Sequence, residues 1–237
     1  MRKLLLLSNS TNVGEEHLGY AKPAISGLLG KSVKEILFVP YAAVGFNFDD
    51  YTRKVNEALN TLGYHVRGLH QVDHAREAVE KADAIMVGGG NTFALLKRLY
   101  DNDVIEAIVE QVNSGTPYVG WSAGSNVAGP SIKTTNDMPI VQPSSFEALN
   151  LVPFQINPHY TEKTIANHGG ESRKDRLNEF IELNPGIRVV GLPEGNLIEI
   201  KGGTIQLFGA GPITVFRQGD PEAYLTSEDN LDFLLAE

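Results

Sequence analysis

Residues 117–128 of this chain read PYVGWSAGSNVA, an apolar run followed at once by small residues. The run at 116–120 is typical of a buried strand and 122–128 is typical of a helix start, so Ser122 falls at the junction. Similar apolar runs recur along the chain and alternate with amphipathic stretches. Because parallel strands need long crossover connections, this alternation predicts a largely parallel sheet covered by helices.

The pattern predicts strands at about 3–8, 34–40, 64–69, 83–87, 116–120, 153–157 and 187–192. It predicts helices at about 22–29, 48–62, 74–81, 91–99, 103–114, 122–128 and 173–183. The expected fold class is therefore α/β: a three-layer, doubly wound, mostly parallel sheet with helices on both faces.

The last fifty residues have a different character. Apolar runs at 197–200, 204–207 and 213–216 are joined by a Gly202-Gly203 turn and by loops. We interpret them as a small antiparallel extension on the edge of the same sheet. No linker or repeat divides the chain, which predicts a single α/β domain over residues 1–237. The polar segment 129–152 lacks periodicity, and such long irregular segments are commonly functional.

Composition narrows the class of protein. The chain has 237 residues, of which 42% are hydrophobic and 21% charged, as in ordinary globular proteins. A net charge of −9 disfavours binding to nucleic acid phosphates. The absence of cysteine excludes disulfides, thiolate metal sites and a cysteine nucleophile. The apolar run at 4–7 is too short for a signal peptide, and no run could span a membrane, so we expect a cytoplasmic protein.

Ser122 lies in the pattern Gly-Trp-Ser-Ala-Gly, with Gly120 and Gly124 two positions to either side. A nucleophile elbow needs small residues there, because the chain must turn sharply to expose the serine oxygen. The amides and dipole of the following helix then face the developing negative charge. The alternative is a glycine-rich turn in which Ser122 only caps a helix.

A second glycine loop, Gly88-Gly89-Gly90-Asn91, follows the apolar run at 84–87. Open α/β sheets bind ligands at the carboxyl ends of their strands, where this loop would lie. We expect the amide of Gly90 to form an oxyanion hole with that of Ala123. The glycines could instead serve a tight turn. A phosphate-binding loop is disfavoured, because the Gly-x-Gly-x-x-Gly pattern and a following lysine are absent.

A serine nucleophile needs a general base, and histidine is the usual one. The candidates are His17, His65, His70, His74, His159 and His168. His159 is favoured because it follows the apolar run at 152–156, at the end of a predicted strand. The imidazole needs an acidic partner in turn, and both Asp137 and Glu194 qualify. The alternatives are an Asx-turn role for Asp137 and a solvated turn position for Glu194.

These motifs, in this order, resemble peptidase E, the α-aspartyl dipeptidases. The resemblance rests on the glycine loop, the serine elbow, Asn136-Asp137-Met138-Pro139, Asn157-Pro158-His159 and Gly170-Glu171-Ser172-Arg173. It implies a fold similar to class I glutamine amidotransferases, with serine where those enzymes carry cysteine. It also implies a catalytic triad of Ser122, His159 and Asp137, with Glu194 as a nearby acid that assists. No metal or organic cofactor is implied.

The resemblance further implies hydrolysis of dipeptides with an N-terminal aspartate. We expect the protein to be a monomer or a homodimer. An aspartyl carboxylate is well matched by a planar guanidinium. Residues 171–176 supply Arg173 and Arg176, and the resemblance points to Arg173. The alternative is that both arginines belong to the solvated first turn of a helix.

Three other functions compete with this one. A cyanophycinase-like β-aspartyl exopeptidase would share the fold and the serine nucleophile. An α/β-hydrolase esterase shares the order Ser, Asp, His, but its histidine usually lies further from the serine than 37 residues. A non-catalytic module could use the two glycine loops to bind an anion.

Overall fold

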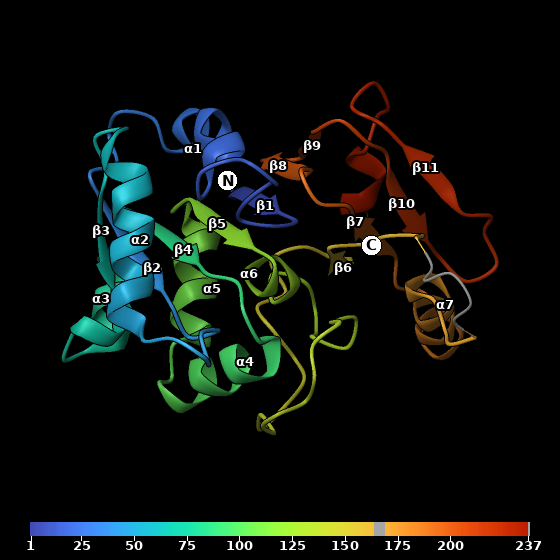
Figure 1. Ribbon diagram of the computed structural model, residues 1–237, viewed down its shortest axis with the longest axis horizontal. Helices are drawn as coiled ribbons and strands as arrows, with labels where there is room; N and C mark the ends of the chain where they lie inside the picture. Colours follow the sequence, from blue (N-terminus) through green and yellow to red (C-terminus); the bar gives the residue numbers. More distant parts are fainter. Residues whose placement is uncertain (164–168, 237) are drawn as a thin grey trace.

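The computed structural model describes residues 1–163 and 169–236 (Figure 1). It contains two sheets. The first has the strands β1 (Lys3–Leu7), β2 (Glu35–Val39), β3 (His65–Gly68), β4 (Ala84–Val87), β5 (Tyr118–Trp121), β8 (Leu197–Lys201) and β9 (Thr204–Phe208). The second has β6 (Gln155–Pro158), β7 (Val189–Leu192), β10 (Ile213–Phe216) and β11 (Ala223–Leu225).

The first sheet has the strand order β3-β2-β4-β5-β1-β8-β9. Its first five strands are parallel, and β8 and β9 continue the sheet in antiparallel fashion beyond β1. The prediction of a mostly parallel sheet with an antiparallel extension is confirmed for this part of the chain.

The second sheet has the order β11-β10-β7-β6, with β6 and β7 parallel and the other pairs antiparallel. The prediction from the sequence that these strands lie in or on the edge of one sheet is wrong for β6, β7 and β10. Short apolar runs show that strands exist, but their pairing depends on contacts far apart in the chain. Figure 1 shows β6, β7, β10 and β11 beside the first sheet rather than within it.

Helices cover the first sheet on both faces. The α-helices of the described residues are α1 (Lys22–Leu29), α2 (Phe48–Asn60), α3 (Ala75–Glu80), α4 (Thr92–Asp101), α5 (Ile105–Ser114), α6 (Ala123–Asn126) and α7 (Arg173–Leu183), close to the predicted ranges, and α7 lies on the second sheet. Buried side chains of α1 and α2 pack on one face with Leu5 and Leu7, and those of α3, α4 and α5 pack on the other with Leu4 and Leu6. Alternation along β1 therefore supports the predicted three layers.

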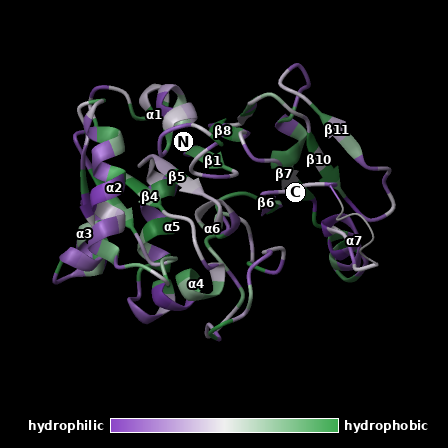
Figure 2. Cartoon of the chain, viewed as in Figure 1, coloured by the Kyte–Doolittle hydropathy of each residue, from purple (hydrophilic) through white to green (hydrophobic). Residues whose placement is uncertain are grey.

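The two sheets share one hydrophobic cluster. Ile156 of β6 and Val190 of β7 pack in the same buried group as Leu4 and Leu6 of β1. On the other face of the second sheet, Leu177 and Ile181 of α7 pack on Val189. Figure 2 shows hydrophobic residues along β4, β7 and β10, and mixed faces on α2. This packing holds the carboxyl ends of strands from both sheets near one another.

The predicted irregular segment between α6 and β6 is found. Residues 129–152 form no helix or strand, apart from an isolated bridge between Ser131 and Glu147. The segment passes the start of α4, where Asn91 donates a hydrogen bond to the Met138 carbonyl. Within residues 1–163 and 169–236, no helix is long and apolar enough to cross a bilayer.

Candidate active site

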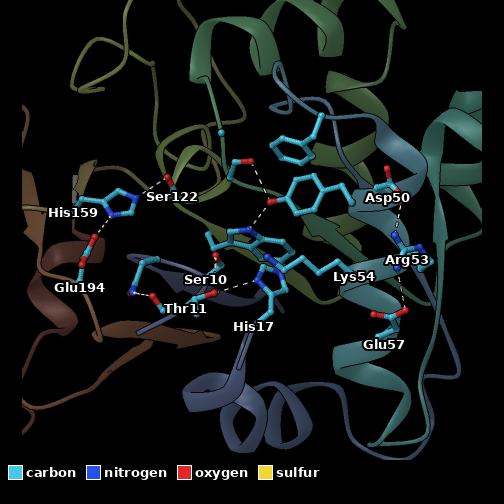
Figure 3. Close-up of a pocket in the computed structure, with 16 residues that line it drawn as sticks. Ser10, Thr11, His17, Asp50, Arg53, Lys54, Glu57, Ser122, His159 and Glu194 are labelled. Carbon is cyan, nitrogen blue, oxygen red and sulfur yellow. Dashed lines mark hydrogen bonds and ion pairs between the residues drawn. The ribbon is translucent and has the colours of Figure 1, made fainter. Parts of the chain in front are cut away.

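The carboxyl ends of strands from both sheets meet around one serine. Ser122 follows β5 of the first sheet, whereas His159 and Glu194 follow β6 and β7 of the second. Figure 3 shows the His159 imidazole between the Ser122 hydroxyl and the Glu194 carboxylate. From the sequence, His159 was expected on the same sheet edge as Ser122. The structure brings them together from two sheets instead.

The chain turns sharply at Ser122, with φ 53° and ψ −115°, a conformation that L-residues rarely adopt. A side chain at Gly120 would overlap the Gly124 carbonyl, and one at Gly124 would overlap the Val87 carbonyl. Ser125 stabilises the turn, because its hydroxyl lies 2.7 Å from the Leu7 carbonyl oxygen and 2.9 Å from that of Gly120. The predicted elbow geometry is therefore present.

The side chains of Ser122, His159 and Glu194 form a continuous series of hydrogen bonds. Ser122 Oγ lies 2.8 Å from Nε2 of His159, and Nδ1 of His159 lies 2.7 Å from Oε1 of Glu194. An ionised carboxylate can only accept, so Nδ1 carries the proton in the neutral imidazole and Nε2 is free to accept from the serine. The geometry suits His159 as a base for Ser122.

Asp137 occupies a different position from the one expected of it. Its Oδ2 accepts hydrogen bonds from the amide and the hydroxyl of Thr92, at 2.7 and 2.6 Å. Thr92 is the first residue of α4, whose free amides and dipole attract a carboxylate. The prediction that Asp137 contacts the imidazole is wrong, because Glu194 holds that place. Both acids were candidates from the residues themselves, and the resemblance pointed to Asp137, whereas the structure places Glu194 beside the imidazole.

Ser8 and Asn9, which directly follow β1, hold this arrangement. They were not predicted from the sequence. The buried Ser8 hydroxyl donates to the Leu192 carbonyl at 2.7 Å and accepts from the His159 amide at 2.9 Å. The Asn9 side chain accepts from the Gly195 amide at 2.8 Å. Ser8 and Asn9 thus connect the first sheet to the loops that carry His159 and Glu194. Their position directly after a strand was the signal that could have revealed them.

The two amides predicted for an oxyanion hole are available. The N–H groups of Gly90 and Ala123 donate to no acceptor within the described part of the chain. Gly90 has φ 140°, and a side chain there would overlap the Ala42 carbonyl. Gly90 and Ser122 line the same pocket. Free amides beside a serine are what an oxyanion hole requires.

Ser122 and His159 lie between two pockets. The smaller, of about 230 Å³, also includes Asp137 and Arg173. Arg173 begins α7, and its guanidinium donates to the His159 carbonyl. Burial lowers the pKa of Arg173 from its ordinary value, although the Glu194 charge opposes this effect. Arg176 is exposed and 3.8 Å from Glu171, outside this pocket, as the alternative of a solvated helix turn predicts.

The larger pocket, of about 600 Å³, has an aromatic wall that the sequence did not reveal. Trp121 and Tyr51 form it with His17, and the Trp121 indole donates to the Tyr51 hydroxyl at 2.9 Å. Helix α2 supplies charged residues on another side of this pocket, including Arg53 and Lys54. These residues lie far apart in sequence and had no shared motif.

The remaining histidines take no part in the series around Ser122. His70 bonds to Asp49 at 2.9 Å, and His65 and His74 line neither pocket. His168 lies outside the described residues. Among the residues that the structure describes, no group of three or more histidine and acidic side chains could hold a metal ion.

Comparison with known proteins shows the family of the chain. A model of peptidase family S51 matches residues 4–208. The chain is 51% identical over 234 residues to a protein named Peptidase E from Nostoc sp., covering 99% of this chain and 97% of that one. It is 48% identical over 204 residues to Peptidase E of Haemophilus influenzae, covering 86% and 94%.

A solved structure shows the same fold. The crystal structure of a peptidase from an acI-B1 actinobacterium aligns with a TM-score of 0.71 at 19% identity, covering 98% of this chain and 96% of that one. The fold and the sequence relatives agree with the resemblance inferred from the motifs. The chain therefore belongs to peptidase family S51 and is a serine peptidase, a hydrolase.

Proposed function

We propose that this peptidase hydrolyses dipeptides whose first residue is aspartate. The observation that carries the proposal is the guanidinium of Arg173 in the 230 Å³ pocket that also contains Ser122 and His159. The protein has a net charge of −9, so an acidic substrate needs a local cation at its binding site. A guanidinium supplies that charge and can make two parallel hydrogen bonds to a carboxylate.

In the proposed reaction, Ser122 attacks the carbonyl carbon of the aspartyl residue while His159 accepts the serine proton. The negative oxygen of the tetrahedral intermediate accepts hydrogen bonds from the amides of Gly90 and Ala123. His159, oriented by Glu194, then donates its proton to the leaving amine, and the peptide bond breaks. Water, deprotonated by His159, hydrolyses the acyl-enzyme and releases aspartate.

The small pocket also offers a group for the substrate's amino terminus. Asp137 lines it, and both hydrogen bonds from Thr92 go to a single carboxylate oxygen, Oδ2. The Asp137 carboxylate would pair with the substrate ammonium, while Arg173 pairs with the aspartyl side chain. Opposite charges at two points select a free N-terminal aspartate over a neutral first residue or a peptide extended at its amino end.

The test of the nucleophile is Ser122→Ala. Turnover of Asp-Leu should fall to near background, because the remaining amides and binding groups cannot form an acyl-enzyme. Unchanged circular dichroism would show that the fold is intact. Substantial activity in this variant would refute Ser122 as the nucleophile. Wild-type cleavage of β-Asp-Arg in preference to α-Asp-Leu would instead favour the cyanophycinase-like alternative.

The test of the specificity group is Arg173→Ala, with Arg176→Ala as its matched control on the same helix. The ratio of kcat/KM for Asp-Leu to that for Ala-Leu should fall at least tenfold in the first variant, since a charge-assisted bond to the substrate is lost. Arg176→Ala should leave the ratio within about twofold. An unchanged ratio in Arg173→Ala would exclude Arg173 as the aspartate-binding group.

A further inference from the structure

Apart from Gly90, Ser122, His159 and Glu194, the larger pocket is lined by residues that the proposed reaction does not use. It has a volume of about 600 Å³, and Ser122 and His159 lie between it and the smaller pocket. If the aspartyl residue occupies the smaller pocket, the part of the substrate after the scissile bond must extend into the larger one. The residues that line the larger pocket therefore determine which second residue the substrate can carry.

Helix α2 is fixed against the elbow through Tyr51. The buried Tyr51 hydroxyl donates to the Gly89 carbonyl at 3.1 Å and accepts from the Trp121 indole at 2.9 Å. Gly89 lies so close to Ser122 that a methyl group added to it would meet the Ser122 Cβ at 2.8 Å. The position of α2 relative to the nucleophile is thus set by buried hydrogen bonds.

Lys54 stands three residues after Tyr51, so both lie on the same face of α2. The neighbouring cation, Arg53, is paired with Asp50 at 2.7 Å and Glu57 at 3.3 Å. Lys54 has no acidic partner within 4.0 Å among residues 1–163 and 169–236. Figure 3 shows Arg53 between Asp50 and Glu57, whereas the Lys54 side chain extends toward His17.

Away from α2 the pocket is lined by aromatic rings, with Glu194 as an acid beside His159. The His17 ring is uncharged at neutral pH. Burial, with a smaller contribution from the Lys54 charge, lowers the pKa of His17 to about 4. The His17 ring packs edge-on against Trp121, with centroids 6.1 Å apart. Phe46 stands at the same pocket and is about half exposed. An apolar side chain can pack on this wall while a carboxylate reaches Lys54.

We propose that the larger pocket binds the second residue of the substrate, its side chain against Phe46 and the His17 ring and its free α-carboxylate paired with Lys54. This inference rests on the proposed function and extends it to the leaving group. A dipeptide ends in a carboxylate at this point, whereas a longer peptide continues with a neutral amide. Lys54 is then a residue that selects substrates by length.

The test compares two substrates that differ only at the terminal carboxylate, Asp-Leu and Asp-Leu amide. Wild-type kcat/KM should favour Asp-Leu by about five- to twentyfold, the value of a partly exposed ion pair with hydrogen bonding. Lys54→Met should lower kcat/KM for Asp-Leu by about that factor and leave the amide within twofold. Lys54→Arg should keep most of the preference, because it retains the charge.

The matched control is Lys97→Met, which makes the same change in net charge on α4. Lys97 pairs with Asp101 at 2.6 Å and lies outside both pockets, so the preference should not change. An equal loss for both substrates in Lys54→Met would overturn the role of Lys54. So would a wild type that cleaves the two substrates equally well.

Failure of the inference is distinguishable from failure of the proposed function. If wild type cleaves Asp-Leu and Ser122→Ala does not, the function stands whatever Lys54 does. If wild type cleaves no Asp-X substrate, both are overturned. Calorimetric binding to Ser122→Ala supplies a readout without turnover. Asp-Leu should bind this variant more tightly than the amide does, and the added change Lys54→Met should remove the difference. Equal affinities before that change would contradict the proposal.

Discussion

Glu194 lies 2.7 Å from His159 although 35 residues separate them in the chain. The cause is strand pairing. β6 and β7 are parallel neighbours with Pro158 opposite Leu192, so the first residues beyond each strand emerge side by side. His159 has φ 54° and its amide donates to the buried Ser8 hydroxyl, which turns the imidazole toward the elbow. The acid that orients the imidazole is thus set by the second sheet.

Glu194→Gln should lower kcat for Asp-Leu by about 10²- to 10⁴-fold, because the amide cannot stabilise the imidazolium and can favour the wrong tautomer. It should also slow labelling of Ser122 by a fluorophosphonate, a reagent without an amino group. Glu228→Gln, at an exposed position in a loop far along the chain, is the control. Labelling at the wild-type rate in Glu194→Gln would show that another group orients His159.

Asp137→Asn should weaken substrate binding, whereas Glu194→Gln should slow the reaction of Ser122. We expect KM for Asp-Leu to rise about tenfold or more through loss of the charge that faces the substrate ammonium, while the labelling rate stays within about twofold. The free energy of unfolding should fall by about 1 kcal/mol, since the carboxylate no longer stabilises the start of α4. Kinetics, labelling and urea unfolding measure the three quantities. A labelling rate that fell as far as in Glu194→Gln would restore Asp137 to the triad.

Ser8→Ala should both destabilise the protein and slow the reaction. Removing the hydroxyl leaves the Leu192 carbonyl and the His159 amide without this buried partner, which costs about 1 to 3 kcal/mol of unfolding free energy. The loss should also reduce the labelling rate, because the His159 backbone is no longer held in its left-handed conformation. Urea unfolding and labelling at 10 °C, where the variant is folded, separate the two effects. A destabilised variant with unchanged labelling would limit Ser8 to a structural role.

The partly buried His17 predicts how stability depends on pH. Its pKa is about 4 in the folded protein against 6.5 in the unfolded chain, so between these values the unfolded state binds more protons. The free energy of unfolding should therefore fall as pH decreases from about 6.5 toward 4. His17→Gln removes this contribution. We compare the unfolding free energy of this variant with that of wild type at each pH. The variant minus wild-type difference should be about 1 to 2 kcal/mol more positive at pH 5 than at pH 8, allowing for the partial exposure of His17.

Urea unfolding of both proteins at the two pH values measures this difference. The quantity of interest is the change between pH 5 and pH 8, since the substitution also alters packing by an amount that does not depend on pH. A difference that is constant between pH 5 and pH 8 would mean that His17 titrates normally in the folded protein.

The sequence by itself determined the elements of this protein and the form of its nucleophile. Hydrophobic periodicity and helix boundaries are local, so α1 and α7 were predicted with the same bounds that the structure shows. The five parallel strands of the first sheet were likewise predicted at their positions along the chain. The elbow was equally local, because Gly120 and Gly124 are needed within one turn of chain around Ser122. His159 was found for a related reason, since it directly follows a predicted strand.

Only the tertiary structure decided how the strands divide into two sheets, which acid meets His159 and what lines the pockets. A short apolar run carries no information about its partner strand, and the pairing of β6 with β7 is what brings Glu194 to the imidazole. From the sequence, Asp137 and Glu194 were equally suitable partners for the imidazole. Their positions differ because Asp137 accepts a hydrogen bond from the Thr92 amide at the start of α4. Likewise Lys54 lines the larger pocket because buried hydrogen bonds of Tyr51 hold α2 beside the elbow.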